Sequence, residues 1–235
     1  MKRYVSLEEI SDGRLYGGND MVKADCHGCK DCHECCTGMG GSVILDPLDM
    51  YRLEQGVGEG LEALLVKGKL ELGVTGGVVL PGMRMAGEEE RCAFLDESGR
   101  CSIHPWRPGV CRLFPLGRIY ENGDFKYFLQ IGECREKGRT KVKVSKWIDT
   151  PDQARNHAFI CRWHDIISVL EEKVMGAEDL EECKRLNTLL LETFYMDRYE
   201  TDRDFYEQFD ERLARLKTES VFHLEPERPE PERTE

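Results

Sequence analysis

The chain has 235 residues, of which 45 are acidic and 33 are basic, so its formal net charge is −12. This charge argues against nucleic acid as a partner, because no basic stripe is present to neutralise phosphates. No stretch approaches the ~20 apolar residues of a membrane helix, and no apolar segment typical of a signal peptide follows the first residues. We therefore expect a cytoplasmic protein with no membrane contact. Its 11 cysteines then indicate metal or redox chemistry, because thiols stay reduced in that compartment.

Four of these cysteines crowd into one short segment near the N-terminus. They are spaced C-x-x-C-x-x-C-C, as Cys29, Cys32, Cys35 and Cys36. Two residues between thiols allow both sulfurs to face one ion while the intervening backbone N–H groups point at them. Tetrahedral zinc and iron–sulfur clusters are both bound in this way. Core cysteines or disulfides would be scattered along the chain instead, so the spacing predicts a metal site.

The segments around this cluster predict short elements. Residues 1–25 indicate a short helix or turn followed by a loop, because glycines interrupt the segment. Downstream, Asp46 and Pro47 are typical of a helix N-cap and of the first helical position. Apolar periodicity and turn residues predict a strand over 43–45, a helix from Pro47, a second short helix over 58–67 and a hairpin or meander over 70–85.

Further thiols follow in the middle of the chain, as Cys92, Cys101, Cys111 and Cys134. Cys92 and Cys101 form the two ends of a compact turn. Three prolines within residues 103–115 restrict the backbone around Cys111 and exclude a long regular helix there. The Asn-Gly pair at 122–123 predicts a β-hairpin ahead of Cys134. We expect these later thiols to meet the first cluster around metal.

One arginine lies on each side of Cys111 in the sequence, and the positive charge of both could stabilise thiolates bound to a metal. A divalent ion held by four thiolates carries a net charge of about −2, and buried negative charge needs cations or N–H donors nearby. We therefore expect Arg107 and Arg112 to lie beside the thiolates. The alternative is that both are surface arginines held in place by the neighbouring prolines.

From Val144 onward the pattern becomes helical. Apolar residues at helical spacing predict three helices, over about 150–176, 178–199 and 204–217. We expect an α+β fold, in which an irregular metal-centred portion with short strands and hairpins is followed by a C-terminal helical portion. The expected regions are a cysteine-cluster region at 1–149 with its core at about 26–135, helices packed on it at 150–218, and a disordered acidic, proline-rich tail at 219–235.

Three cysteines lie outside the metal-binding pattern. Cys183 falls on an apolar helix face and is expected in the core. Cys161 lies between His157 and His164 in the sequence, so a His/Cys ligand patch is an alternative to a core or surface position. The cysteine spacing C-x-x-C-x-x-C-C assigns no role to Cys26.

The later cysteines and arginines also stand within longer motifs, namely Cys92-Ala-Phe-Leu-Asp, Cys101-Ser-Ile-His and Arg107-Pro108-x-x-Cys111-Arg112-x-Phe114-Pro115. Together with the first cluster, and with Cys134 ahead of Trp147, they resemble the YkgJ or CxxCxxCC family of zinc- or iron-chelating cysteine-cluster proteins. The resemblance covers about residues 26–150. It implies metal chelation, and family members are often regarded as iron–sulfur oxidoreductases. A related cluster occurs in flagellin lysine-N-methylases, but nothing else in this chain indicates that activity.

Spacing and resemblance select the same eight metal ligands, which are Cys29, Cys32, Cys35, Cys36, Cys92, Cys101, Cys111 and Cys134. Eight thiolates suffice for two four-thiolate sites, or for one cluster with spare thiols. We favour iron, or an iron–sulfur cluster, over zinc. The expected function is a cytoplasmic protein that chelates iron or zinc. The alternatives are an iron–sulfur oxidoreductase or electron carrier, whose catalytic residues the sequence leaves unassigned, and a structural-zinc scaffold that binds a protein partner.

Overall fold

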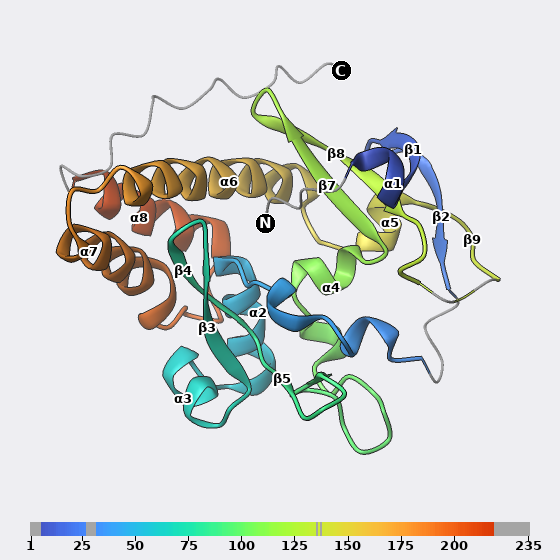
Figure 1. Ribbon diagram of the computed structural model, residues 1–235, viewed down its shortest axis with the longest axis horizontal. Coiled ribbons are helices and arrows are strands. Elements are labelled where there is room, and N and C mark those ends of the chain that lie inside the picture. The colour runs from blue at the N-terminus through green and yellow to red at the C-terminus, as the bar shows by residue number, and fades with distance from the viewer. Residues whose placement is uncertain (1–5, 27–31, 135, 137, 219–235) are drawn as a thin grey trace.

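The computed structural model of the chain describes residues 6–26, 32–134, 136 and 138–218 (Figure 1). These residues combine helices with short antiparallel strands, which confirms the expected α+β class. In chain order the elements are α1 Leu7–Ile10, β1 Ser11–Tyr16, β2 Met21–Asp25, η1 Glu34–Cys36, η2 Gly40–Ser42, α2 Pro47–Val57, α3 Leu61–Val66, β3 Leu70–Thr75, β4 Val78–Met83, β5 Met85–Ala86, β6 Arg91–Cys92, η3 His104–Trp106, α4 Gly109–Leu113, β7 Leu116–Glu121, β8 Asp124–Gln130, β9 Thr140–Lys143, α5 Val144–Ile148, α6 Gln153–Met175, α7 Leu180–Leu191, η4 Glu192–Met196 and α8 Phe205–Thr218.

The strands form several small sheets. One has three strands in the order β1-β8-β7, and β2-β9, β3-β4 and β5-β6 form two-stranded pairs. The expected hairpin at 122–123 is confirmed, because Glu121 pairs with Asp124 across a two-residue turn. Asn122 and Gly123 both have positive φ, at 53° and 74°, which is the geometry that favours Asn-Gly in this turn. The expected hairpin over 70–85 is the pair β3-β4.

The C-terminal helices pack through aromatic side chains. In Figure 1, α6 is the longest helix, and α7 and α8 lie near it. The ring of Phe159 on α6 meets that of Phe209 on α8 edge-on with centroids 4.9 Å apart, and Phe194 of η4 lies 5.5 Å from Phe209. All three rings are at most 2% exposed. The predicted apolar stripes therefore form the main part of a large core.

A second, smaller cluster of buried residues lies around β2, α5 and the sheet β1-β8-β7. It contains Tyr16, Val22, Ala24, Leu113, Leu116, Leu129, Val144 and Ile148. Helix α4 belongs to both clusters, because Leu113 is buried in the small cluster whereas Val110 and Cys111 pack against the large core. Figure 1 shows α4 between the helical part and the small sheets.

Two local expectations were wrong. Residues 11–25, expected as a turn and loop, form β1 and β2, because β1 pairs with β8 and β2 with β9, both more than a hundred residues away. Residues 43–45 do not form a strand. They make a single bridge from Ile44 to Gly82, flanked by backbone bonds from Leu45 N to Pro81 O and from Met83 N to Val43 O, both 2.9 Å.

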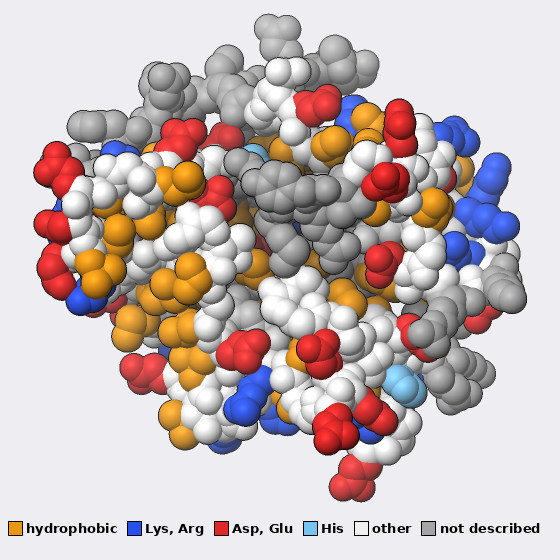
Figure 2. All heavy atoms as spheres, in the orientation of Figure 1, with side chains coloured by type: hydrophobic (Ala, Val, Ile, Leu, Met, Phe, Trp, Pro, Cys, Tyr) orange, Lys and Arg blue, Asp and Glu red, His pale blue; other side chains and the backbone are white. Residues whose placement is uncertain are grey.

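The visible surface of the molecule is mixed in character. Hydrophobic side chains gather on the face over the hairpin β3-β4 (Figure 2), where Leu72 and Val74 are 47% and 70% exposed. Acidic side chains are scattered around this face. Among the described residues, none of the helices is both long enough and apolar enough to traverse a lipid bilayer.

Candidate metal centre

One narrow cavity is lined by cysteines from widely separated parts of the chain. Its volume is about 100 Å³, and the thiols around it are Cys26, Cys32, Cys35, Cys36, Cys92, Cys101, Cys111 and Cys134. Seven of these are predicted ligands, so the structure brings together every predicted ligand that it describes. Cys29, the remaining predicted ligand, lies outside the described residues. Cys26 is an addition that the sequence reasoning missed.

The local fold explains how several of these thiols reach the cavity. Cys35 and Cys36 lie in the single turn η1, with their Sγ atoms 4.0 Å apart. Cys92 ends β6, and Cys101 pairs with Leu95 in an isolated bridge. The turn between them is organised by Asp96, whose side chain accepts hydrogen bonds from the backbone N–H groups of Ser98 and Arg100 at 2.9 and 2.8 Å. Such carboxylate-to-backbone bonds are a usual way to fix a tight turn.

Cys111 is positioned by contacts between α2 and α4. Asp46 and Asp49 form a capping box at the start of α2, as the Asp46-Pro47 pair predicted for the helix start. Asp49 Oδ1 also accepts a hydrogen bond from Gly109 N at 2.7 Å, the first residue of α4. This bond attaches the short helix of Cys111 to α2, which belongs to the large core.

Cys26 and Cys134 reach the cavity from segments that adjoin strands β2 and β8. Cys26 follows β2 directly and is 9% exposed. Cys134 lies in the segment that connects β8 to β9. The pairing of Asp25 with Thr140 holds the sheet β2-β9 together, and Thr140 Oγ1 donates to Asp25 Oδ2 at 3.3 Å.

The adjacent thiols Cys35 and Cys36 have pKa values that are shifted in opposite directions. A hydrogen bond from Cys36 lowers the pKa of Cys35 to about 7, and the positive charge of Arg107 acts in the same direction. The same hydrogen bond, with burial, raises the pKa of Cys36. Burial also raises the pKa of Cys92, Cys101 and Cys111, and the negative charge of Cys35 adds to each increase. Without a cation, the cavity therefore favours a single thiolate over several.

The donor chemistry of these residues suits a positively charged, thiophilic group, although among the described residues no three of the cavity sulfurs all lie within 4.8 Å of one another. The donors around the cavity are cysteine sulfurs, the ligand type that selects zinc, Fe–S clusters and other soft metals. Among the described residues, Arg107 Nε and Arg139 Nη1 are buried nitrogens without a hydrogen-bond partner. A buried guanidinium N–H in that state is costly unless negative charge lies nearby, and thiolates bound to a metal supply that charge.

The two predicted arginines have different surroundings. Arg107 lines the cavity and contacts His104 Nε2 through its Nη1. Arg112 does not line it, and its N–H groups donate to the backbone oxygens of Arg107 at 3.1 Å, of Asp149 at 3.2 Å and of Pro105. Arg112 therefore holds the irregular segment around the cavity. Its expected position beside the thiolates stays a prediction.

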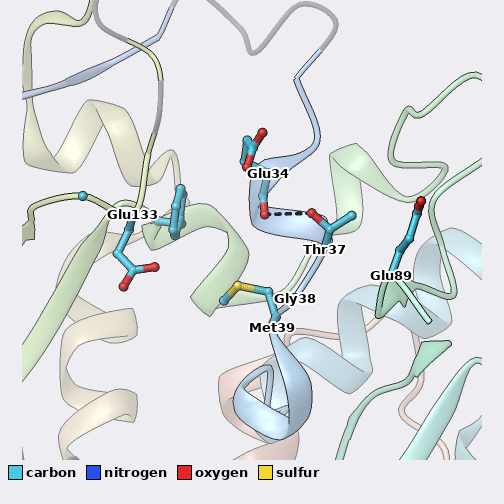
Figure 3. A pocket seen from close by; sticks show the side chains of 8 residues that line it. Glu34, Thr37, Gly38, Met39, Glu89 and Glu133 are labelled. Atoms are coloured by element: carbon cyan, nitrogen blue, oxygen red, sulfur yellow. Dashed lines mark hydrogen bonds between the residues drawn. The ribbon is translucent and has the colours of Figure 1, made fainter. Parts of the chain in front are cut away.

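A second, more open pocket adjoins the thiol cavity. Its volume is about 410 Å³, and Figure 3 shows Glu34, Glu89 and Glu133 around Met39 and Gly38. The three carboxylates come from separate segments and do not point toward one another (Figure 3). Glu34 and Phe114 line this pocket and the thiol cavity alike. The pocket is therefore a solvent-facing neighbour of the thiols and lacks the convergent ligands of a separate metal site.

The remaining cysteines lie away from the cavity. Cys183 is half-buried, and its thiol points at Val174 O, 3.6 Å away. Cys161 Sγ lies 4.0 Å from His157 Nδ1, and His157 Nε2 lies 2.9 Å from Asp124 Oδ1. These three groups lie within 4.8 Å of one another. His164, the other candidate of the His/Cys patch, stacks instead on Tyr120 with ring centroids 3.8 Å apart.

Comparison with known proteins agrees with this geometry. Residues 28–130 match the family model CxxCxxCC, described as "Putative zinc- or iron-chelating domain". No curated protein and no solved structure matches the chain. The matched segment includes six of the eight thiols around the cavity, all except Cys26 and Cys134. The family model thus matches the same segment whose cysteine spacing and flanking motifs resemble the CxxCxxCC family.

Proposed function

We propose that this chain is a cytoplasmic metal-binding protein that chelates iron or zinc through the thiolates of the cysteine cavity. The observation that carries the proposal is the convergence of eight cysteines, from four separate parts of the chain, on one cavity. In a reducing compartment such a group of thiols is more stable as metal thiolates than as free thiols, because a cation removes the repulsion between neighbouring thiolates.

Iron in a cluster fits the cavity better than one bare ion. A single water-sized occupant needs roughly 10–15 Å³ of such space. The cavity of about 100 Å³ has room for several atoms or for more than one ion. When bound, an iron–sulfur cluster would supply one-electron chemistry at a potential set by charge and hydrogen bonds around the sulfurs. Here Arg107 would supply both, because its guanidinium lines the cavity with Nε buried.

One observation favours the alternative of an electron carrier or oxidoreductase. The open pocket of about 410 Å³ shares Glu34 and Phe114 with the thiol cavity, so a redox partner or substrate in this pocket would contact residues that also line the thiol cavity. A structural zinc site fills all four coordination positions with protein ligands, whereas a catalytic site keeps one position open to water or substrate. The neighbouring open pocket therefore favours a reactive centre.

The test is purification under anaerobic conditions, followed by metal and sulfide analysis and visible absorption. A brown protein with iron and acid-labile sulfide supports the cluster, and a reversible change of its spectrum on reduction supports electron transfer. Stoichiometric zinc in a colourless protein supports zinc chelation. A reduced protein that holds neither metal after purification or after anaerobic reloading, while remaining folded by circular dichroism, contradicts the proposal.

A further inference from the structure

A group of metal-ligating side chains lies outside the thiol cavity, where helix α6 contacts the hairpin β7-β8. One ligand atom from each of Asp124, His157 and Cys161 lies within 4.8 Å of the other two. None of these residues lines the thiol cavity or the open pocket. Within the described part of the chain, this is the one group of three histidine, cysteine or carboxylate side chains that converge so closely.

Helix α6 places two of these side chains next to each other. His157 and Cys161 are four residues apart on α6, so they lie on one face of the helix and one turn apart. Cys161 Sγ lies 4.0 Å from His157 Nδ1. The same i, i+4 spacing puts paired ligands on one helix face in helical zinc sites. The helix therefore supplies one nitrogen and one sulfur donor side by side.

The hairpin β7-β8 supplies the third donor and orients the histidine ring. Asp124 is the first residue of β8, and its Oδ1 lies 2.9 Å from His157 Nε2. The same oxygen accepts a hydrogen bond from Phe125 N at 2.7 Å. The ring of Phe125, which is 4% exposed, stacks on the imidazole with centroids 4.5 Å apart. A buried side chain thus holds the imidazole between the carboxylate and the thiol.

The distances between the three donors suit a single small ion. Zinc bonds of ~2.3 Å to sulfur and ~2.1 Å to nitrogen or oxygen place neighbouring tetrahedral ligands roughly 3.5 Å apart. The donors lie within 4.8 Å of one another, so they need to close by only about 1 Å around the ion. The side chains of His157 and Asp124 are 47% and 58% exposed, which leaves them room to tilt and lets the ion enter from solvent.

The chemistry of the donors selects zinc. A thiolate, a carboxylate and a neutral imidazole carry two negative charges, so their complex with a divalent ion is neutral and needs no buried counter-ion. Sulfur and imidazole donors suit zinc, whereas magnesium and calcium prefer oxygen ligands alone. The thiol of Cys161 binds as the thiolate, and its proton leaves to solvent when the ion binds.

We propose that Asp124, His157 and Cys161 form a second metal site, the α6 site, which binds one zinc ion with water at the fourth position. This inference goes beyond the proposed function and does not depend on it, because the α6 site shares no ligand with the thiol cavity. The rival for the same geometry is a thiol activated by a histidine base that a carboxylate orients. The two differ in whether zinc covers the sulfur.

The experiment measures how zinc protects Cys161 from alkylation in the full-length protein. Protein depleted of accessible ions by a chelator is treated with N-ethylmaleimide at increasing zinc concentrations. Tryptic peptide 156–162 contains Cys161 as its only cysteine, so mass spectrometry follows this thiol apart from those of the cavity. At free zinc ten times the dissociation constant, alkylation of Cys161 should slow about tenfold. Alkylation of Cys183 should not respond to zinc.

Three variants identify the other ligands. His157→Gln and Asp124→Asn each remove one donor, so protection of Cys161 should require a zinc concentration at least about tenfold higher. His164→Gln is the matched control, because His164 lies on the same helix but stacks on Tyr120. It should be protected at the same zinc concentration as wild type. Circular dichroism and an unchanged alkylation rate of Cys183 show that each variant is folded.

The α6 site is overturned if zinc leaves the alkylation rate of Cys161 unchanged in wild type. It is also overturned if His157→Gln and Asp124→Asn are protected at the same zinc concentration as wild type. If zinc gives no protection and alkylation of metal-free Cys161 slows in His157→Gln, the group is the activated thiol instead. Failure of the thiol cavity to hold metal would contradict the proposed function and leave the α6 site standing, because the Cys161 peptide is measured by itself.

Discussion

Gly56 allows a test of how α2 supports the wall of the cavity. A Cβ atom added at Gly56 would lie 2.3 Å from Cδ2, 2.5 Å from Cγ and 2.6 Å from Cε3 of Trp106. These atoms belong to the part of the indole ring nearest the backbone, so the ring cannot simply swing aside. Trp106 ends η3 directly before Arg107, which lines the cavity. Gly56→Ala should therefore displace η3 and disturb the metal site.

The expected change in the free energy of unfolding of Gly56→Ala follows from two opposing effects. An unobstructed glycine-to-alanine change inside a helix stabilises a protein by roughly 0.5–1 kcal/mol. Overpacking of a closed contact costs about 1–3 kcal/mol. We expect Gly56→Ala to lower the free energy of unfolding by about 1–2 kcal/mol, and to speed the release of metal to a chelator because the segment carrying Arg107 shifts.

The assay is urea unfolding of the metal-loaded protein together with the rate of metal transfer to a chromogenic chelator. Gly41→Ala is the matched control, because nothing lies within 4 Å of its added Cβ. In a Trp106→Leu background the obstruction is gone, so Gly56→Ala should cost nothing or stabilise. The reasoning is refuted if Gly56→Ala costs the same in both backgrounds, or if it stabilises the otherwise unchanged protein.

Two further predictions concern the ligands and the α2 cap. Cys32→Ser or Cys111→Ser should release metal and speed hydrogen exchange within residues 26–135, while circular dichroism still detects part of the helicity of α6 to α8, and Cys183→Ser should leave metal content unchanged. Burial and the charge of Asp49 raise the pKa of Asp46 from 3.8 to about 7. The folded state therefore holds this proton more tightly than the unfolded state, so this group makes stability fall as pH rises from about 4 to about 7, by up to about 1.4 kcal/mol per pH unit. Asp46→Asn keeps a capping oxygen without the charge, so urea unfolding across this range should show a flatter dependence, and an identical slope in both proteins would contradict the assignment.

The sequence predicted the helices well because their signals are local. Apolar periodicity and an acidic cap place α6 correctly, with Asp152 as its N-cap and Gly176 just beyond its end. The hairpin β7-β8 was predictable for the same reason, since Asn122-Gly123 fixes the turn without reference to the rest of the chain. In each case the residues that decide the structure lie within a few positions of one another.

The strands β1 and β2 were missed because their signals are not local. Along β1 only Ser11 and Tyr16 are buried, so apolar and polar residues do not alternate as in a half-buried strand. The strand exists because β8 supplies its hydrogen-bond partners from the other half of the chain. Cys26 was missed for a related reason. Its position at the cavity depends on the pairing of β2 with β9, which no local pattern in the sequence indicates.

The position of α4 explains why metal binding and folding should be coupled in this chain. Val110 and Cys111 pack on the large core and Leu113 is buried in the small cluster, so this short helix joins two groups of buried residues that otherwise come from different elements. A helix of five residues has little stability of its own in water. Its place depends on the bond from Gly109 N to Asp49 on one side and on Leu113 on the other. Metal bound by Cys111 would add a bond at the middle of α4. Loss of the metal should therefore weaken the packing of α4 between the two clusters before either cluster unfolds.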